Sequence, residues 1–231
     1  LVGSEMCIRD RYYNDAFYDN FDSAKLGPDW SFRRVPQPNT YSLSANKGHL
    51  RLYLKPESFQ PRKRYSAMGI TQKESEFEWE AKMRFSPKKI GEEAGISVYQ
   101  KDINYINLTV QKIGKNHVVK VTVKEKNNHV TEMNDSDLFA TTGFKAYKSK
   151  VLPNYKGEIL LKMSSKNGKY LYFFSLDGGV NYEKLAETPD NIVLGMMYTG
   201  ANVGVYATSN NQKTNAYVDF DWVNYKGFVR R

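Results

Sequence analysis

The sequence predicts an all-β fold in which short antiparallel strands form a sandwich or a barrel. The clearest signal is residues 76–85, where aromatic and aliphatic side chains alternate with charged ones. This is the pattern of a strand, because successive side chains of a strand point to opposite faces of a sheet. About twelve or more such segments are separated by turn residues roughly every 8–12 positions, the spacing of a sandwich or barrel. Apart from a turn near residues 187–191, no stretch has the 3.6-residue period of a helix.

The first half of the chain supplies the strands around this central pattern. Residues 31–35 are a short strand candidate that ends at Pro36. Residues 46–48 are a hairpin turn that leads into the next strand, because Asn and Gly tolerate the backbone conformation of tight turns. The strands expected in this half cover residues 31–35, 41–44, 49–54, 67–70, 76–85, 94–99, 105–110 and 117–124.

The second half begins with a polar region, residues 127–153, which we expect to hold an extended loop and one short strand. After it, Asn167-Gly168 is a two-residue hairpin turn. Residues 177–179 form another turn, and residues 175–182 resemble the Asp-box of β-propeller glycosidases. We interpret that motif as a structural hairpin in which Asp177 caps its own turn. The strands expected here cover residues 157–163, 170–175 and 182–185.

The C-terminal stretch organises the rest of the chain. Residues 198–206 are small and contain Gly200 and Gly204, which permit tight turns or close backbone approach. Residues 216–225 alternate cleanly as a half-buried strand. One face of this strand is expected to carry Ala216, Val218, Phe220 and Trp222. Together the two segments predict a β-hairpin at the closing edge of the sandwich, with the loop before Tyr206 helping to contact a partner.

Composition limits the function classes. A chain of 231 residues is long enough for one large all-β domain. Its formal net charge is +9, but the lysines are scattered and no basic recognition helix is present, so solubility explains the charge better than nucleic-acid binding. No apolar run reaches the roughly 18 residues of a membrane span. Cys7 is the only cysteine, which excludes an internal disulfide.

The N-terminus does not read as part of a domain. Residues 5–10 resemble a translated sequencing adapter of the kind found at the ends of metagenomic contigs, and no apolar core of a signal peptide is present. We therefore expect residues 1–11 to be an artefact and the chain to start within a longer, bacterial gene. Residues 12–18 are a linker or the tail of a missing upstream domain, residues 19–227 form the sandwich, and residues 228–231 are a tail.

No residue is predicted to be catalytic. His49, His117 and His129 are isolated, without metal-ligand spacing, and no nucleophile-elbow motif is present. Glu76, Glu78 and Glu80 share one strand face and are expected to form a solvated or second-sheet polar face instead of a catalytic site. Glu92 and Glu93 are placed in a loop.

No cofactor is expected to be required. A structural Ca²⁺ is one hypothesis, because hard cations bind clustered oxygen ligands and the terminal strands can bring carboxylates together. The alternative is simple surface carboxylates. The candidate ligands are Asp19, Asp22, Asp219 and Asp221.

Aromatic residues are the best indication of a sugar ligand. The chain is 14% aromatic with 17 tyrosines. Flat rings suit both pleated sheets and sugar faces. Tyr99, Tyr105 and Tyr206 are candidates for stacking on a sugar, with core packing as the alternative. Tyr198 is the strongest candidate, because it precedes a glycine turn instead of lying within a strand.

Several motifs occur in the order found in one known family. The chain resembles the C-terminal concanavalin A-like domain of family 43 glycoside hydrolases, of the β-xylosidase and arabinofuranosidase type. The similarity covers about residues 17–227. The motifs are Asp19-Asn-Phe with Leu26-Gly-Pro-Asp-Trp30, Tyr41-Ser-Leu-Ser with Gly48-His-Leu-Arg-Leu52, Glu93-Ala-Gly-Ile-Ser-Val98, Phe174-Ser-Leu-Asp-Gly178, Tyr198-Thr-Gly-Ala-Asn-Val-Gly204 and Val218-Asp-Phe-Asp-Trp222.

The resemblance implies a concanavalin A-like jelly-roll sandwich of two antiparallel sheets that accompanies a catalytic domain. That domain is an N-terminal five-bladed propeller with three carboxylates, inverting at the anomeric carbon, and it is missing from this chain. The resemblance also implies that the substrate of the whole enzyme is a xylo-oligosaccharide or arabinoxylan. In the family a loop aromatic, usually Phe, helps to wall the substrate pocket, and Tyr198 stands at that position.

Two other functions stay open. The chain is alternatively a free-standing carbohydrate-binding module with stacking tyrosines on a concave sheet, or a purely structural or oligomerisation domain. The sequence does not separate a xylosidase from an arabinofuranosidase. A periplasmic or extracellular location is preferred over a cytoplasmic one.

Overall fold

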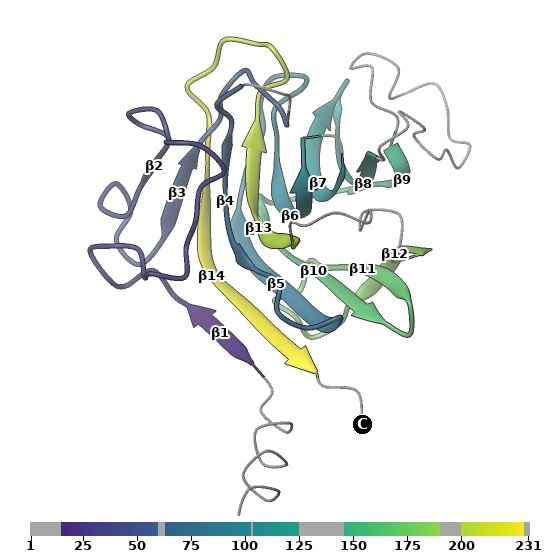
Figure 1. Cartoon of the computed structure of the whole chain (residues 1–231). Coiled ribbons are helices and arrows are strands. Elements are labelled where there is room, and N and C mark those ends of the chain that lie inside the picture. The colour runs from purple at the N-terminus through teal and green to yellow at the C-terminus, as the bar shows by residue number, and fades with distance from the viewer. Residues whose placement is uncertain (1–14, 60–62, 103, 125–145, 190–199, 229–231) are drawn as a thin grey trace, which may run out of the picture.

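The protein folds as two antiparallel β-sheets packed face to face, as the computed structural model shows (Figure 1). The structure describes residues 15–59, 63–102, 104–124, 146–189 and 200–228. These ranges contain fourteen strands and no helix. Within them, accordingly, there is no helix of the length and hydropathy needed to cross a membrane. The all-β sandwich predicted from alternation and turn spacing is confirmed.

The larger sheet has eight strands. Its order is β12-β11-β10-β5-β14-β3-β2, and β1 pairs with β14 beside this path. Its strands are β1 (Ala16–Asp19), β2 (Tyr41–Ser42), β3 (Leu50–Tyr53), β5 (Glu76–Arg84), β10 (Glu158–Lys166), β11 (Lys169–Ser175), β12 (Glu183–Pro189) and β14 (Tyr217–Phe228).

The smaller sheet has six strands in the order β4-β13-β6-β7-β8-β9. Residues Ser31 and Gly69 form one isolated bridge at its β4 edge. The strand predicted over residues 31–35 is therefore wrong, since only Ser31 pairs. The strands of this sheet are β4 (Ser66–Thr71), β6 (Glu93–Lys101), β7 (Asn104–Ile113), β8 (Asn116–Lys124), β9 (Ala146–Val151) and β13 (Asn202–Thr208). Strand β9 is the short strand expected within residues 127–153.

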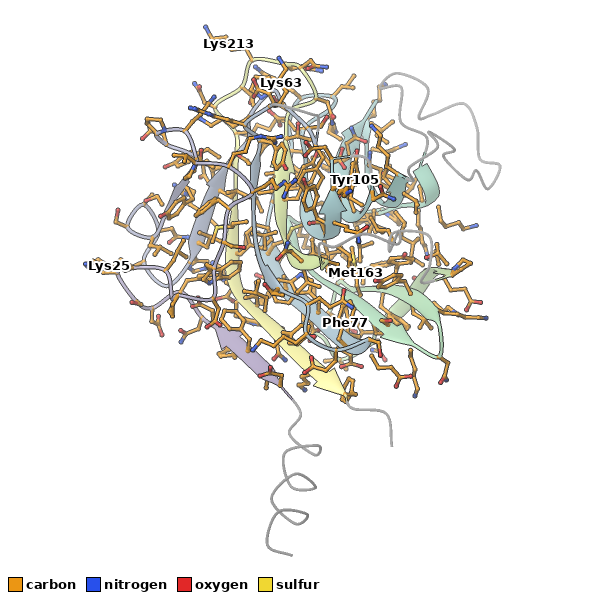
Figure 2. The ribbon with its side chains drawn as sticks, viewed as in Figure 1. Lys25, Lys63, Phe77, Tyr105, Met163 and Lys213 are labelled. Carbon is orange, nitrogen blue, oxygen red and sulfur yellow. The ribbon has the colours of Figure 1, made fainter. Side chains whose placement is uncertain are left out.

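The main core lies between the two sheets. Strand β5 confirms the alternation on which the fold prediction depends, since Phe77, Trp79, Ala81 and Met83 have 0% exposed surface. The Trp79 side chain crosses the core, and its Nε1–H donates a hydrogen bond of 3.1 Å to the Gly204 carbonyl on the other sheet. Figure 2 shows Phe77 in this core, far from Tyr105, which belongs to a second aromatic cluster.

The hairpin signals are confirmed where two strands are joined by a tight turn. Asn167 and Gly168 both have positive φ angles, 52° and 73°, as the turn between β10 and β11 requires. Between β11 and β12, the Ser175 hydroxyl donates to Asp177, which in turn accepts from the Asn181 backbone N–H at 3.0 Å. Backbone and side-chain hydrogen bonds from Asn181 and Ser175 lower the pKa of Asp177 to about 2. The Asp-box segment is therefore a capped turn, as predicted.

The two C-terminal segments do not form a hairpin. Strand β13 lies in the six-stranded sheet and β14 in the eight-stranded sheet. Strand β14 is also central instead of at an edge, because it pairs with β5 on one side and with β1 and β3 on the other. Alternation within a segment does not indicate which sheet the strand joins. The prediction that the two segments pair as one hairpin is therefore wrong.

A β-bulge interrupts β14 between Phe220 and Trp222. Val218 and Phe220 point into the core as predicted, but Trp222 opposes Lys82 on the outer face, and its ring lies 6.3 Å from that of Tyr18. After the bulge, the next side chain that is buried in the core is that of Val223. One extra residue in a strand reverses the inside and outside positions that follow it, and this is why the predicted placement of Trp222 is wrong.

Candidate functional site

The residue expected to wall a substrate pocket lies outside the described part of the structure. Tyr198 belongs to residues 190–199, which connect β12 of the larger sheet to β13 of the smaller sheet. The described chain resumes at Gly200. The role of Tyr198 therefore stays a prediction.

Three other candidate tyrosines gather on the outer face of the six-stranded sheet. On β6, Ile96 and Val98 point into the main core, so Tyr99 points away from it. Tyr105 on β7 and Tyr206 on β13 occupy the same outer face, and the three rings share one cluster. The fold thus brings together three tyrosines that the sequence analysis had treated only as separate candidates for stacking on a sugar.

A phenylalanine from a distant loop fills the space between these rings. The Phe59 ring centroid lies 4.7 Å from that of Tyr99, 4.9 Å from that of Tyr105 and 4.5 Å from that of Tyr206. Tyr65 completes the cluster at 4.7 Å. Sequence reasoning missed Phe59, because residues 56–64 have the polar, Pro-flanked composition of a surface loop.

Burial leaves two of the candidate rings without a free face. Tyr105 and Tyr206 are each 2% exposed, whereas Tyr99 is 6% exposed and borders a cavity. Burial raises the pKa of Tyr105 and of Tyr206, because a phenolate loses its hydration there. In this arrangement Tyr105 and Tyr206 contact other aromatic rings and offer no stacking surface to a sugar.

A polar network fixes the outer edge of the aromatic cluster. The hydroxyls of Tyr65 and Tyr99 donate to Asp102 Oδ1 at 2.9 and 2.7 Å, and Arg34 contacts Asp102 Oδ2 at 3.0 Å. Burial raises the pKa of Tyr99 to about 12. Burial opposes ionisation of Asp102, but the hydrogen bonds from Tyr99, Arg34 and Tyr65 lower its pKa below the ordinary value. The two rings are thus held by a carboxylate that stays charged at neutral pH.

Beside this network lies a cavity of about 180 Å³. It spans the outer face of β4, β13 and β6 and is bordered by residues 31–33 and by the Phe59 and Tyr65 side chains. The side chains that line it include Phe32, Arg33, Ser97, Tyr99 and Asn202. Aromatic walls with a few convergent polar groups are the usual composition of a small-molecule site.

Glu92 lies in the loop before β6 as predicted, whereas the prediction of a loop is wrong for Glu93, and both side chains are buried. Glu93 begins β6, and its carboxylate accepts from Thr109 at 2.8 Å and contacts Lys120 Nζ at 3.2 Å. Glu92 accepts the backbone N–H groups of Lys88 and Lys89. Both carboxylates therefore have structural partners, as expected for carboxylates that stabilise the fold.

The carboxylates considered for calcium are each bound by a protein group. Asp19 accepts from the Trp30 indole at 2.8 Å. Asp219 forms a two-bond pair with Arg51, at 2.7 Å for each bond, and Asp221 contacts Lys82 at 2.9 Å. Asp22 accepts from Asn20. In the ranges that the structure covers, no three His, Cys, Asp or Glu side chains come close enough to hold a metal.

The remaining titratable candidates lie on separate surfaces. Glu80, on the outer face of β5, accepts from the Tyr182 hydroxyl, and burial raises the pKa of Glu80. Glu76, Glu78 and Glu80 are each half-buried on this outer face. His49 lies 3.8 Å from Asp221, and His117 Nε2 lies 3.2 Å from the Pro87 carbonyl. His129 is outside the described residues.

Two curated relatives match this chain over nearly its whole length. The chain is 29% identical over 212 residues to a non-reducing end alpha-L-arabinofuranosidase of Bacteroides ovatus, covering 90% of this chain and 36% of that protein. It is 26% identical over 216 residues to a putative beta-xylosidase of Escherichia coli, covering 90% of this chain and 38% of that protein. The chain thus spans less than two fifths of the length of these relatives.

Two solved structures have a fold similar to the one described above. The GH43B protein of a Bacteroides ovatus xyloglucan locus superimposes with a TM-score of 0.78 at 26% identity, covering 91% of this chain and 39% of that protein. A GH43 protein of Bacillus licheniformis has the same fold, with a TM-score of 0.76 at 24% identity, 91% of this chain and 39% of that protein being covered. The family model of the beta xylosidase C-terminal concanavalin A-like domain matches residues 18–226. The chain therefore belongs to the C-terminal concanavalin A-like domain family of family 43 glycoside hydrolases.

Proposed function

We propose that this chain is the accessory C-terminal sandwich of a family 43 glycoside hydrolase that acts on xylo-oligosaccharides or arabinoxylan. The observation that carries the proposal is the family match over residues 18–226, together with relatives that are more than twice as long and are named for glycosidase activities. In the described part of the chain, Glu92 and Glu93 are both satisfied by structural partners. We therefore assign the chemistry to a separate catalytic domain, the five-bladed propeller, with which this sandwich packs.

The contribution of the sandwich to catalysis is a pocket wall supplied by Tyr198. An aromatic wall next to the terminal sugar excludes water and fixes the ring, which places the scissile bond against the catalytic carboxylates. The Tyr198 hydroxyl adds a polar group to a wall that is usually Phe in this family. Gly200, two residues after Tyr198, allows the backbone to turn close to a neighbouring domain.

The test uses the enzyme with its upstream catalytic part, recovered by sequencing the source gene further upstream. Tyr198→Ala is expected to raise KM or lower kcat for xylobiose, by roughly tenfold in kcat/KM if about 1.4 kcal/mol of binding is lost. Tyr198→Phe is expected to retain most of the activity, because it keeps the ring. Tyr18→Ala, which truncates an exposed aromatic elsewhere, is the control. Unchanged kcat and KM in Tyr198→Ala would contradict the proposal.

The competing function, a free-standing carbohydrate-binding module with an open row of stacking tyrosines, has less support. Tyr105 and Tyr206 are covered by Phe59 and by neighbouring rings. Retardation of the chain in affinity electrophoresis on xylan would favour this alternative. If neither the xylan test nor Tyr198→Ala gives an effect, a structural or oligomerisation role is the better description.

A further inference from the structure

We propose that the cavity on the outer face of the six-stranded sheet is a binding site for a single ring of a neutral saccharide. This inference does not depend on the proposed function, since it concerns a surface of the sandwich and not a catalytic pocket. The cavity measures about 180 Å³, which is small compared with the roughly 300–1,000 Å³ of drug-sized sites. It therefore admits one ring, and not a stretch of polysaccharide.

Aromatic side chains form the walls. Phe32 borders the cavity from the segment before β2 and stacks on Tyr41 at 5.4 Å with an interplanar angle of 29°. Phe59, Tyr65 and Tyr99 also border it. Phe32 is half-buried, whereas Phe59, Tyr65 and Tyr99 are 1%, 8% and 6% exposed, so the Phe32 ring is the one that can contact the apolar C–H surface of a sugar. The three buried rings make the surroundings apolar, which disfavours charged, strongly hydrated ligands.

The walls are held in place before any ligand arrives. The Tyr65 and Tyr99 hydroxyls are 3.0 Å apart, and both donate to Asp102, which is also paired with Arg34. Tyr65 and Tyr99 are therefore not free to change rotamer without breaking a charge-assisted network. A preorganised site loses less conformational entropy on binding, so even a small contact area gives measurable affinity.

Besides Ser31, whose hydroxyl donates to the Gly69 carbonyl, three further polar side chains line the same cavity. Ser97 is 2% exposed, Asn202 is half-buried and Arg33 is exposed. A hydroxyl, an amide and a guanidinium together donate to and accept from sugar hydroxyls. No carboxylate lies among the described residues that line the cavity, which disfavours a cation as the ligand.

The floor of the cavity is mostly backbone. Gly69 and Gly204 face each other across β4 and β13, and Gly204 is opposite Ser97 across β13 and β6. The row continues beyond the cavity through Asn107 to Thr122, whose side-chain oxygens are buried without a hydrogen-bond partner in the described structure. Buried polar atoms are nearly always satisfied, so this row is expected to hold ordered water next to the ligand.

The experiment is an NMR titration of the whole 231-residue chain with xylose, arabinose, glucose and xylobiose. A single ring in a small site is expected to bind with a dissociation constant on the order of 1 mM. The expected result is a saturable shift of backbone amide signals in residues 31–33, 97–99 and 202–204. Shifts in all three of these segments, which are far apart in sequence, distinguish one cavity from scattered weak contacts.

Variants connect the shifts to the lining side chains. Asn202→Ala and Arg33→Ala are each expected to weaken binding about fivefold, the effect of one lost hydrogen bond. Both positions are at least partly exposed, so the variants are expected to fold. Tyr18→Ala, on the eight-stranded sheet, should leave the titration unchanged and serves as the control.

Two results would overturn the site. The first is the absence of saturable shifts in these residues with every neutral sugar, and the second is binding that persists unchanged when Asn202 and Arg33 are both alanine. The first result includes the case in which glucuronate, added as a charged comparison, gives shifts and no neutral sugar does. These outcomes are independent of Tyr198→Ala in the full enzyme, so either proposal can fail while the other stands.

Discussion

The Phe59 side chain sets the character of the outer aromatic cluster. It is 1% exposed and contacts four tyrosine rings, although it comes from a loop and not from a strand. Aromatic rings contribute both a large buried area and favourable edge and offset contacts. A face that would otherwise present an open row of tyrosines is thereby converted into a second small core, and only the side next to Phe32 keeps a cavity.

Phe59→Ala is expected to destabilise the protein by about 3–5 kcal/mol, because it removes the ring that four tyrosines pack against and leaves a cavity. The measurement is the free energy of unfolding from urea denaturation. Phe228→Ala is the matched control, since Phe228 is 39% exposed at the end of β14 and its loss is expected to cost about 0.5 kcal/mol or less. A cost for Phe59→Ala no larger than that of the control would show that the loop does not anchor the cluster.

Strands β4 and β13 pair at a distance that only glycine permits. A Cβ atom at Gly204 would lie 2.3 Å from the Met68 carbonyl oxygen, and one at Gly69 would lie 2.5 Å from the Val203 carbonyl oxygen. Both obstacles are backbone atoms, which cannot move aside as a flexible side chain does. Gly204 therefore supports close strand pairing, as the sequence predicted, whereas Gly200 has open space around its Cβ position.

The pair Gly204→Ala and Gly200→Ala separates these two situations. Gly204→Ala is expected to cost about 1–3 kcal/mol, because the added methyl group forces β13 away from β4. Gly200→Ala is expected to change the free energy of unfolding by no more than about 0.5 kcal/mol. Thermal and urea unfolding of both variants provide the comparison. Equal effects of the two substitutions would mean that β13 adjusts its position freely.

At the scale of the whole molecule, local patterns predicted the elements and long-range contacts decided the arrangement. The alternation in residues 76–85 and the Asn167-Gly168 turn depend only on neighbours in sequence, and both are present in the structure. The bulge in β14 and the separation of β13 from β14 depend on distant strands. For this reason the sequence predicted the fold class and misplaced Trp222.

The candidate site was predictable to a smaller extent for the same reason. Alternation places Tyr99, Tyr105 and Tyr206 on outward-facing positions, yet nothing near them in sequence indicates that Phe59 covers them. Nothing near Asp102 in sequence indicates its pairing with Tyr65 and Arg34 either. Its contacts with Tyr65 and Arg34 span 37 and 68 residues. Contacts of that range are set by sheet order, which a single sequence does not reveal.

The buried tyrosines make the stability of the whole protein sensitive to alkaline pH. Burial raises the pKa of Tyr65, Tyr105, Tyr206 and Tyr225 above the ordinary value and that of Tyr99 to about 12. A folded-state pKa above the unfolded value means that the unfolded chain releases its proton first. The contribution of these protonated tyrosines to the free energy of unfolding is therefore fully present below the unfolded pKa of about 10. It is lost as the pH rises through the folded pKa values.

Alkaline unfolding should accordingly begin above about pH 10 and be cooperative, with phenolate absorbance of the buried tyrosines appearing together with loss of the far-ultraviolet circular dichroism signal. Tyr105→Phe removes one of these groups while it keeps the ring in place against Phe59. The variant is expected to unfold at a higher pH, since each pH unit between the two pKa values of a group costs the wild type about 1.4 kcal/mol. Ionisation of the buried tyrosines in a protein that stays folded, or an unchanged midpoint in Tyr105→Phe, would show that the cluster admits water. In that case the Phe59 ring would not seal the outer face of the six-stranded sheet.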